Sequence, residues 1–409
     1  MLRWQCQRLL TIMLSLSLFP TAQAATITVA PAASVYATPD LSPVFRTIRL
    51  TGSIEPGDAN KLRIVLLDLT ASATMPNNAL IVAELNGTGG DYYEAMMIGY
   101  MFRDFRVATI VRKGDECLSA CVLAFLGGSS GDRGPEAPSP RRYIEIGGIV
   151  GFRNYYSRPA PGEPAPNYPV QSLVDYSIRM GVEPSYRLLL TGLAPGKFTY
   201  IDTVEKFLVA RTCPIGLGRS TATLAEQAAN ACSHALRLRD PDTSMRGTPL
   251  TASEARRLLL KYVQLHVWWL GVVGEPGFMS RGTGGGGYVG QKSGLASRLS
   301  SDEYLRNEEM AKNLYSDLKA AGLPLPNLTG TIFQVSAYLS SYDTTTEQAL
   351  FSKVGCVVNL SQADYDDYDL VVQSQSGGTT MPALRSAAES CRGLPRRDRN
   401  EVINPVLPR

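Results

Sequence analysis

Histidine is nearly absent from this chain: only His234 and His266 occur among its 409 residues. Histidine is the usual general base near neutral pH and the commonest metal ligand in proteins. The cysteines do not supply the missing ligands, because no two of them stand in a Cys-x-x-Cys spacing. We therefore expect neither a zinc site nor a bound cofactor.

A strong net charge is also lacking. The whole chain carries +3, and it would carry +1 without Arg3 and Arg8. A nearly balanced chain offers no electrostatic case for binding nucleic acid or anionic lipid. The glycine run at 284–287 is not followed by Gly-Lys-Ser/Thr, so we expect a flexible linker there and not a phosphate loop.

The N-terminus lacks an apolar run long enough to cross a bilayer. Leu9–Phe19 is apolar over 11 residues, whereas a transmembrane helix needs about 20. Arg3 and Arg8 precede this run, and Ala22-Gln-Ala24 has the small-x-small form of a cleavage site. Residues 1–24 therefore predict an export signal and a periplasmic or secreted protein. The alternative is a short membrane anchor, if the signal stays uncleaved.

Removal of this signal leaves an even number of cysteines, which predicts disulfides in an exported chain. Six cysteines can pair in 15 ways, and the sequence alone does not select one of them. Proximity along the chain favours the pairs 117–121, 213–232 and 356–391. The residues concerned are Cys117, Cys121, Cys213, Cys232, Cys356 and Cys391.

Length and composition predict two domains. Residues 25–45 are rich in Ala, Thr and Pro and are expected to be a lead-in. Alternating strand and helix patterns then begin, and a loop-like composition near 240–251 places the first domain at 46–245. A smaller α+β domain is expected at 250–392, followed by a basic, disordered tail at 393–409.

The first domain has the pattern of an α/β fold with a parallel sheet. We expect strands at Ala79–Leu85, Val107–Val111 and Ile144–Phe152, and helices at Asp91–Phe105 and Ser119–Leu126. In the second half, a capping box at Thr251–Glu254 predicts a helix over 255–273. A further helix is expected at Asp302–Ala321, and a strand at Thr331–Leu339.

Two turns of the first domain have residues suited to chemistry. Gly89-Gly90 joins a strand to a helix, where backbone N–H groups can approach a ligand without side-chain obstruction. Ser119 stands at a second strand-to-helix turn, flanked by Cys117 and Cys121. Its hydroxyl is either a nucleophile at the mouth of the sheet or an N-cap, since both roles need this position.

These segments resemble the Clp-protease/crotonase superfamily. Thr51-Gly-Ser-Ile-Glu-Pro-Gly-Asp58 resembles the Gly-x-Ile strand and turn of the Clp protease proteolytic subunit. Leu85-Asn-Gly-Thr-Gly-Gly90 is similar to its Asn-Ser-Pro-Gly-Gly loop, and Leu118-Ser-Ala-Cys121 to its nucleophile turn. The Cys-x-Ser-Ala-Cys turn is especially similar to that of periplasmic Clp-like proteins. The resemblance covers roughly 46–205 and implies the superfamily's β-β-α spiral fold.

The resemblance also implies roles for particular residues. Ser119 takes the nucleophile position, and the N–H groups of Gly90 and Ala120 form the oxyanion hole, with Gly89 beside it. The implied ligand is an extended peptide or an acyl group. The superfamily commonly forms rings, so a homo-oligomer is expected.

The catalytic histidine of the superfamily has no counterpart here. Phe152 or Arg153 occupies its place, and Arg153, the better match, cannot accept a proton. The nearest candidates for the third triad member are Asp175 and Asp202. Replacement bases would be Lys113, Lys197 or His234, while His266 is expected to be packed in a helix.

The leading hypothesis is therefore an exported serine-peptidase-like protein with weak or absent peptide or acyl hydrolysis. The alternatives are a peptide-binding pseudoenzyme and a subunit of a ring-shaped assembly.

Overall fold

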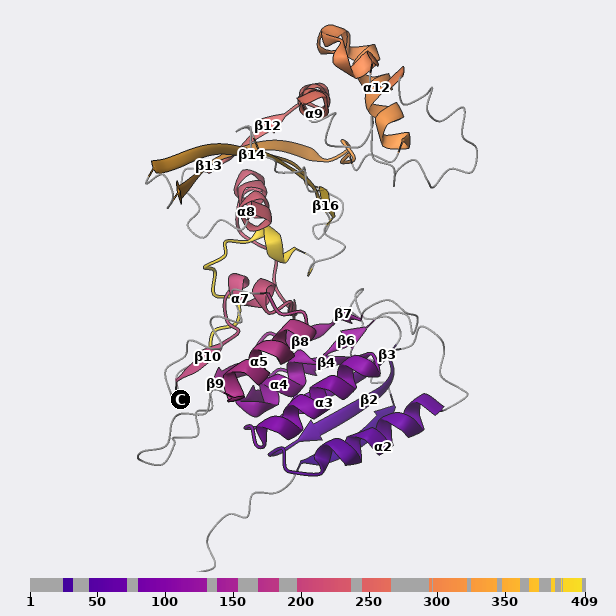
Figure 1. Cartoon of the computed structure of the whole chain (residues 1–409), viewed down its shortest axis with the longest axis vertical. Coiled ribbons are helices and arrows are strands. Elements are labelled where there is room, and N and C mark those ends of the chain that lie inside the picture. Colours follow the sequence, from indigo (N-terminus) through magenta and orange to yellow (C-terminus); the bar gives the residue numbers. More distant parts are fainter. Residues whose placement is uncertain are drawn as a thin grey trace, which may run out of the picture. The chain divides into compact units, whose positions relative to one another are not determined.

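The chain folds into two compact units, described here from a computed structural model (Figure 1). Unit 1 comprises 1–202, 209–216 and 404–409, and unit 2 comprises 203–208 and 217–403. The predicted signal, the glycine run at 284–287 and His266 lie outside the described residues. These residues are 25–31, 44–71, 80–130, 138–153, 168–183, 197–236, 245–265, 294–295, 297–321, 325–343, 348–360, 368–374, 384–386, 391 and 393–406.

A six-stranded sheet forms the centre of unit 1, in the order β1-β2-β3-β4-β8-β11. The first pair is antiparallel and every later pair is parallel, as the alternation of strands and helices predicts. The strands are β1 (Thr26–Pro31), β2 (Val44–Thr51), β3 (Leu80–Asn86), β4 (Val107–Val111), β8 (Arg142–Glu145) and β11 (Cys213–Ile215).

Helices pack along this sheet, and a small second sheet carries the candidate site (Figure 1). All seven side chains of α4 are buried, which its uniformly apolar sequence requires. The helices are α2 (Asp58–Ala71), α3 (Tyr92–Asp104), α4 (Ala120–Leu126) and α5 (Tyr168–Arg179). The small sheet has the order β10 (Phe198–Tyr200), β9 (Ile149–Arg153), β5 (Glu116–Leu118). A pair of two-residue strands, β6 (Ser129–Ser130) and β7 (Ser139–Pro140), lies in the loop between α4 and β8.

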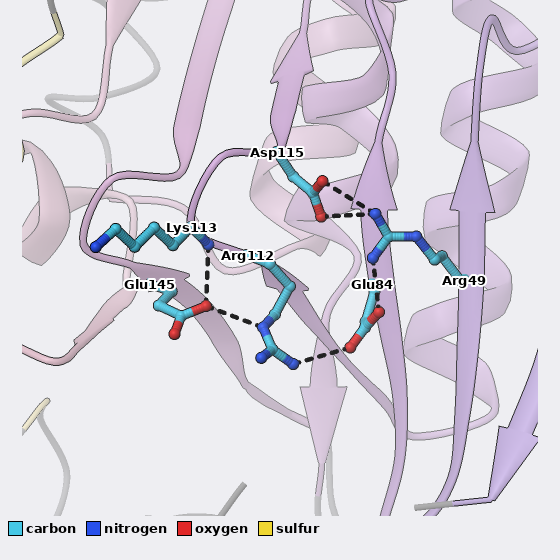
Figure 2. Close-up of a pocket in the computed structure, with 6 residues that line it drawn as sticks. All are labelled: Arg49, Glu84, Arg112, Lys113, Asp115 and Glu145. Atoms are coloured by element: carbon cyan, nitrogen blue, oxygen red, sulfur yellow. Dashed lines mark hydrogen bonds and ion pairs between the residues drawn. The ribbon is translucent and has the colours of Figure 1, made fainter. Parts of the chain in front are cut away.

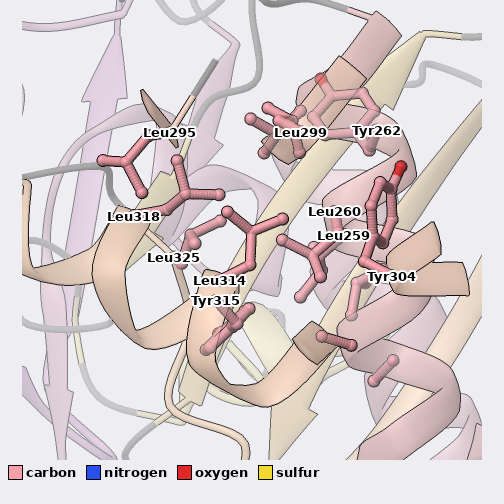
Figure 3. Packing of buried hydrophobic residues seen from close by; sticks show 14 of the residues in the cluster. Leu259, Leu260, Tyr262, Leu295, Leu299, Tyr304, Leu314, Tyr315, Leu318 and Leu325 are labelled. Carbon is pink, nitrogen blue, oxygen red and sulfur yellow. The ribbon is translucent and has the colours of Figure 1, made fainter. Parts of the chain in front are cut away.

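An antiparallel sheet of five strands forms the core of unit 2, with helices on both faces (Figure 1). Successive residues of a strand point to opposite faces. Phe333 and Val335 accordingly pack with one helix, α8, while Ile332 packs with two others, α9 and α12. Figure 3 shows leucines and tyrosines of this second cluster. The elements are α8 (Leu224–Leu236), β12 (Gly247–Leu250), α9 (Ala252–Leu265), α12 (Glu308–Ala320), β13 (Thr331–Asp343), β14 (Gln348–Leu360), β15 (Tyr368–Ser374) and β16 (Leu384–Ser386).

Short helices complete unit 2: α7 (Val204–Val209, whose last residue belongs to unit 1), η2 (Asp302–Leu305) and η4 (Leu394–Arg396). Within the described residues, no helix is long and apolar enough to cross a membrane. The structure confirms an α/β first unit followed by an α+β unit, and it places most predicted helices and strands within a few residues. The strand predicted at Ile144–Phe152 is two strands, because the chain turns at Gly147-Gly148.

The predicted boundary between the domains differs from the observed one. The longer segment of unit 2 begins after Gly216, not near 245–250, because α8 packs its alanines on the sheet of unit 2. The predicted disordered tail is also wrong over 393–406. That segment is ordered, contains η4, and buries Leu394 and Arg396.

Only one of the three predicted disulfides is correct. Cys117 is bonded to Cys121, as predicted. Cys232 is bonded to Cys356, which rules out 213–232 and 356–391, although Cys213 and Cys391 are themselves disulfide-bonded. Packing decides the pairing: Cys232 and Cys356 both lie in the core between α8 and the sheet of unit 2.

These two bonds should differ in their effect on stability. The chain-entropy argument gives about 5 kcal/mol for a bond that closes a loop as long as 232–356, and about 2 kcal/mol for 117–121. We expect the Cys232→Ala/Cys356→Ala variant to lose more unfolding free energy in urea than Cys117→Ala/Cys121→Ala. Equal losses, or a non-reducing peptide map without the 232–356 peptide pair, would contradict the pairing.

Candidate active site

Ser119 adopts a backbone conformation that serine rarely takes. It links β5 to α4 with φ 52° and ψ −122°. A non-glycine residue with positive φ is strained, at a cost on the order of 1–3 kcal/mol, and persists only where its surroundings fix it. A serine on a sharp, strained strand-to-helix turn is the arrangement that presents a nucleophilic hydroxyl.

Bonds on both sides of Ser119 hold this conformation. Its N–H donates to the Gly151 carbonyl (2.8 Å), and the Leu118 N–H donates to the Gly87 carbonyl (2.9 Å). The disulfide between Cys117 and Cys121 then closes the turn, with 5.2 Å between their Cα atoms. The turn is thereby fixed to the neighbouring strand β9, to the glycine loop and to itself.

The Ser119 side chain does not cap α4. It stands at the N-cap position, but it forms no capping hydrogen bond, and its residue is only 5% exposed. Its hydroxyl has no hydrogen-bond partner among the described residues. Of the two roles that the sequence left open, the structure therefore removes the capping role.

The glycine loop lies directly against Ser119. Gly89 and Gly90 have φ +128° and +127°, a region open mainly to glycine. A Cβ on Gly89 would be 2.9 Å from the Ser119 Cβ and 3.4 Å from its Oγ. Because Gly89 has no side chain, it leaves room for the Ser119 hydroxyl.

Gly90 has a different neighbour. A Cβ there would be 2.1 Å from the carbonyl oxygen of Ile54. Ile54 also bridges the loop by accepting from the Asp91 N–H (2.7 Å) and donating to the Gly89 carbonyl (2.8 Å). A side chain at Gly90 would therefore displace the Ile54 backbone, and its first effect would be on the fold.

The N–H groups of Gly90 and Ala120 have no acceptor in the part of the chain that the structure describes. Ala120 is the first residue of α4, where a helix leaves its N–H groups without internal partners. Gly90 precedes the N-cap of α3, Asp91, whose side chain accepts from the Glu94 N–H. Both donors lie on segments next to Ser119: Ala120 follows it in the chain, and Gly90 follows Gly89, whose Cβ would be 2.9 Å from the Ser119 Cβ.

Phe152 and Arg153, the two residues that the sequence places where the superfamily has its histidine, lie at the end of β9. Phe152 is buried, and Arg153 is half-buried at the end of β9. Arg153 pairs across the sheet with Phe198, and its guanidinium lies over that ring, with Cζ 5.4 Å from the ring centre. The guanidinium is a fixed cation and cannot accept the serine proton.

The structure brings no replacement base to Ser119 through any contact that it describes. Lys113, Lys197 and Asp175 are exposed, and Asp202 is half-buried after β10, where its carbonyl accepts from the Asn404 N–H. His234 belongs to unit 2, where its Nε2 lies 2.9 Å from the Arg397 carbonyl. Desolvation lowers the pKa of His234 to about 4, so its ring is neutral near pH 7.

Sequence reasoning missed a ladder of ion pairs across the ends of the strands (Figure 2). Arg49 bridges Glu84 (2.9 Å) and Asp115 (3.0 Å), and Arg112 bridges Glu84 (3.0 Å) and Glu145 (2.9 Å). The hydrogen bond from the Lys113 N–H lowers the pKa of the Glu145 carboxyl, and the Arg112 guanidinium lowers it further. The signal was present: Glu84, Arg112 and Glu145 each stand at or beside the end of an apolar strand.

The ladder lines an open hollow of about 440 Å³. Its arginines and carboxylates satisfy one another, so it is not a ready-made site for a charged ligand. The ladder instead fixes the backbone that leads to Ser119. Asp115, which Arg49 holds on β2, directly precedes β5 and lies four residues before Ser119. The described residues also contain no group of three or more His, Cys, Asp or Glu side chains that could hold a metal.

No family model matches the chain, and no curated protein matches it. Among solved structures, a mutant of the 1510-N membrane-bound stomatin-specific protease is 17% identical, over 36% of this chain and 70% of that one, with TM-score 0.27. Another mutant of that protease, in complex with a substrate peptide, is 16% identical, over 47% and 82%, with TM-score 0.28. The enoyl-CoA hydratase from Bacillus anthracis is 13% identical, over 73% and 92%, with TM-score 0.26. At these TM-scores the likenesses carry no argument about function.

The backbone strain at Ser119 is open to a direct test. Glycine normally costs about 0.5–1 kcal/mol relative to alanine because it loses more chain entropy on folding. At φ 52° this order should reverse, so we expect Ser119→Gly to be at least as stable as Ser119→Ala in urea unfolding. A Ser119→Gly variant that is clearly the less stable of the two would mean that the turn is not strained.

Gly89→Ala should block the site rather than unfold the protein. Its Cβ would meet the Ser119 side chain, so labelling of Ser119 by a fluorophosphonate should fall at least tenfold. Gly57→Ala is the matched control, because Gly57 also has positive φ (+97°) but its Cβ would meet nothing within 4 Å. Equal loss of labelling in both variants, in proportion to their melting temperatures, would assign the effect to strain alone.

Proposed function

We propose that this chain is an exported serine-peptidase-like protein that binds an extended peptide or an acyl group at Ser119. The Ser119 hydroxyl takes the nucleophile position, and the N–H groups of Gly90 and Ala120 bind the carbonyl oxygen as it gains negative charge. No recognisable base accompanies the serine, so hydrolysis is weak or absent. The protein acts in the periplasm or outside the cell, and only an uncleaved signal would tie it to a membrane.

The observation that carries this proposal is the conformation of Ser119. A serine needed only for packing or capping has no reason to be strained, buried and without a hydrogen-bond partner. The adjacent glycine loop supports the same reading, since Gly89 leaves the hydroxyl free where a side chain would cover it. These features together favour a carbonyl-binding site over an accidental turn.

The reaction that this geometry allows is acyl transfer followed by hydrolysis. The Ser119 oxygen would attack a carbonyl carbon, the carbonyl oxygen would move toward the Gly90 and Ala120 N–H groups, and the leaving group would depart with a proton. The hydroxyl proton must pass to a base, and Arg153 cannot take it. Loss of the base in a serine triad commonly reduces turnover by several orders of magnitude.

Two observations support the alternatives. The cationic Arg153 at the histidine position favours a pseudoenzyme that recognises a peptide, with the guanidinium available to a ligand carboxylate. Exposed apolar side chains on the neighbouring helices α2 and α3, Ile64, Leu67, Tyr93 and Met97, favour assembly into a homo-oligomer.

Labelling and hydrolysis by the mature protein test the proposal. We expect slow fluorophosphonate labelling that is confined to Ser119, and hydrolysis of short peptides or esters about two or more decades below that of a complete triad. Arg153→His should raise turnover only if Asp175 or Asp202 orients the new ring, and Asp175→Asn or Asp202→Asn would then remove the gain. Ser119→Ala is the blank.

The outcomes separate the readings. Fast hydrolysis that disappears in Ser119→Ala would overturn the incomplete-triad reading and direct attention to Lys113. No labelling of Ser119 at any reagent concentration, together with no peptide binding, would reject the site itself. Peptide binding without labelling would favour the pseudoenzyme.

A further inference from the structure

Asn404, close to the C-terminus, holds the turn between β8 and β9 with both ends of its amide. Its Oδ1 accepts from the Gly147 N–H (2.8 Å), and its Nδ2 donates to the Gly148 carbonyl (2.7 Å). Its own N–H donates to the Asp202 carbonyl (3.1 Å). Asn404 is 1% exposed, so these bonds are shielded from competing water.

The turn held by Asn404 is bonded to the segment that leads to Ser119. The Gly114 N–H donates to the Gly147 carbonyl (3.1 Å), and the Ile149 N–H donates to the Asp115 carbonyl (3.0 Å). From there β9 and β5 run parallel in register, and the pairing ends where the Gly151 carbonyl accepts from the Ser119 N–H. A shift of the turn would therefore be passed to Ser119 by the strand pairing.

Backbone bonds also hold this turn, and one of them closes it: the Gly148 N–H donates to the Glu145 carbonyl (2.7 Å). Gly147 and Gly148 have no side chains of their own to add to these bonds, and Gly147 has φ +98°, a conformation that glycine adopts without steric cost. The Asn404 amide adds a side-chain group that bonds both glycines directly. The residue before these glycines is bonded to β11: the Ile146 N–H donates to the Ile215 carbonyl (2.9 Å).

The bonds of Ile215 and Asn404 to this turn lie on either side of the longer segment of unit 2. The longer segment of unit 2 is 217–403, so Ile215 stands two residues before it and Asn404 is the first residue after it. Both ends of the inserted segment are thus anchored on the same three residues of unit 1, Ile146–Gly148. We propose that Asn404 is a positioning residue for the nucleophile turn, so that completion of the site depends on the return of the chain from unit 2. This inference rests on the proposed role of Ser119.

The test compares amide hydrogen exchange in full-length variants. Asn404→Ala removes both amide bonds, and Asn404→Asp keeps the acceptor for Gly147 but opposes the Gly148 carbonyl. Asn400→Ala is the matched control, because Asn400 is exposed and its side chain has no described partner. Leu66→Ala, in the buried face of α2, controls for a general loss of stability.

We expect exchange in the peptide covering 114–119 to rise at least about fivefold in Asn404→Ala, and less in Asn404→Asp. It should not rise in Asn400→Ala, nor in Leu66→Ala beyond what that variant's unfolding free energy explains. Faster exchange over 146–151 with unchanged exchange over 114–119 would overturn the proposal, since Asn404 would then hold only its own turn. A rise over 114–119 that matches Leu66→Ala would overturn it as well.

A second readout separates this inference from the proposed function. If Ser119 is labelled in the wild type, its labelling rate should fall in Asn404→Ala by a larger factor than in a Leu66→Ala sample of equal stability. If the wild type is not labelled, the proposed chemistry fails, but the exchange measurements still decide whether Asn404 positions the turn.

Discussion

The positive φ of Ser119 is the constraint on which the candidate site depends. An L-residue leaves this conformation unless its neighbours forbid the alternatives. Here three independent attachments do so: β9 through Gly151, the glycine loop through Gly87, and the disulfide between Cys117 and Cys121. Each attachment acts on a different part of the turn, so the strain is spread over bonds that do not share a partner. A turn fixed in this way presents its hydroxyl without help from the side chains of a triad.

Two further residues, Arg49 and Asn404, fix the segment that leads into the turn. Arg49 secures Asp115 to β2, and Asn404 secures the glycine turn that bonds to Gly114 and Asp115. Both act on the few residues before β5, a stretch that contains a glycine and no buried apolar side chain before Cys117. Where packing is sparse, directed polar bonds must define the position of the chain. The ion pairs are partly exposed, so they contribute geometry more than stability.

Sequence reasoning succeeded where the structure is local and failed where it is not. The strand-to-helix turns at Gly89-Gly90 and Ser119 follow from residue type and flanking periodicity, because each occupies fewer than ten residues. The bond between Cys232 and Cys356 spans 124 positions, and only the packing of α8 on the sheet of unit 2 reveals it. Asn404 gives no signal either, since it lies in a polar tail and its partners are two glycines some 257 residues away. The ladder at the strand ends lies between these extremes, because its charges were visible but their pairing required the sheet order.

The conformation of Ser119 does not depend on which side chain ends β9. Its attachments are two backbone hydrogen bonds and the disulfide between Cys117 and Cys121, and none of them uses the Arg153 side chain. Arg153 is held there by the ring of Phe198 and by its place in β9, so the sheet is satisfied without a proton acceptor. The strained turn and the N–H groups of Gly90 and Ala120 can therefore be kept whichever side chain stands at position 153. Under the proposed function such a site would still bind a polarised carbonyl, so recognition of an acyl or peptide group does not require hydrolysis.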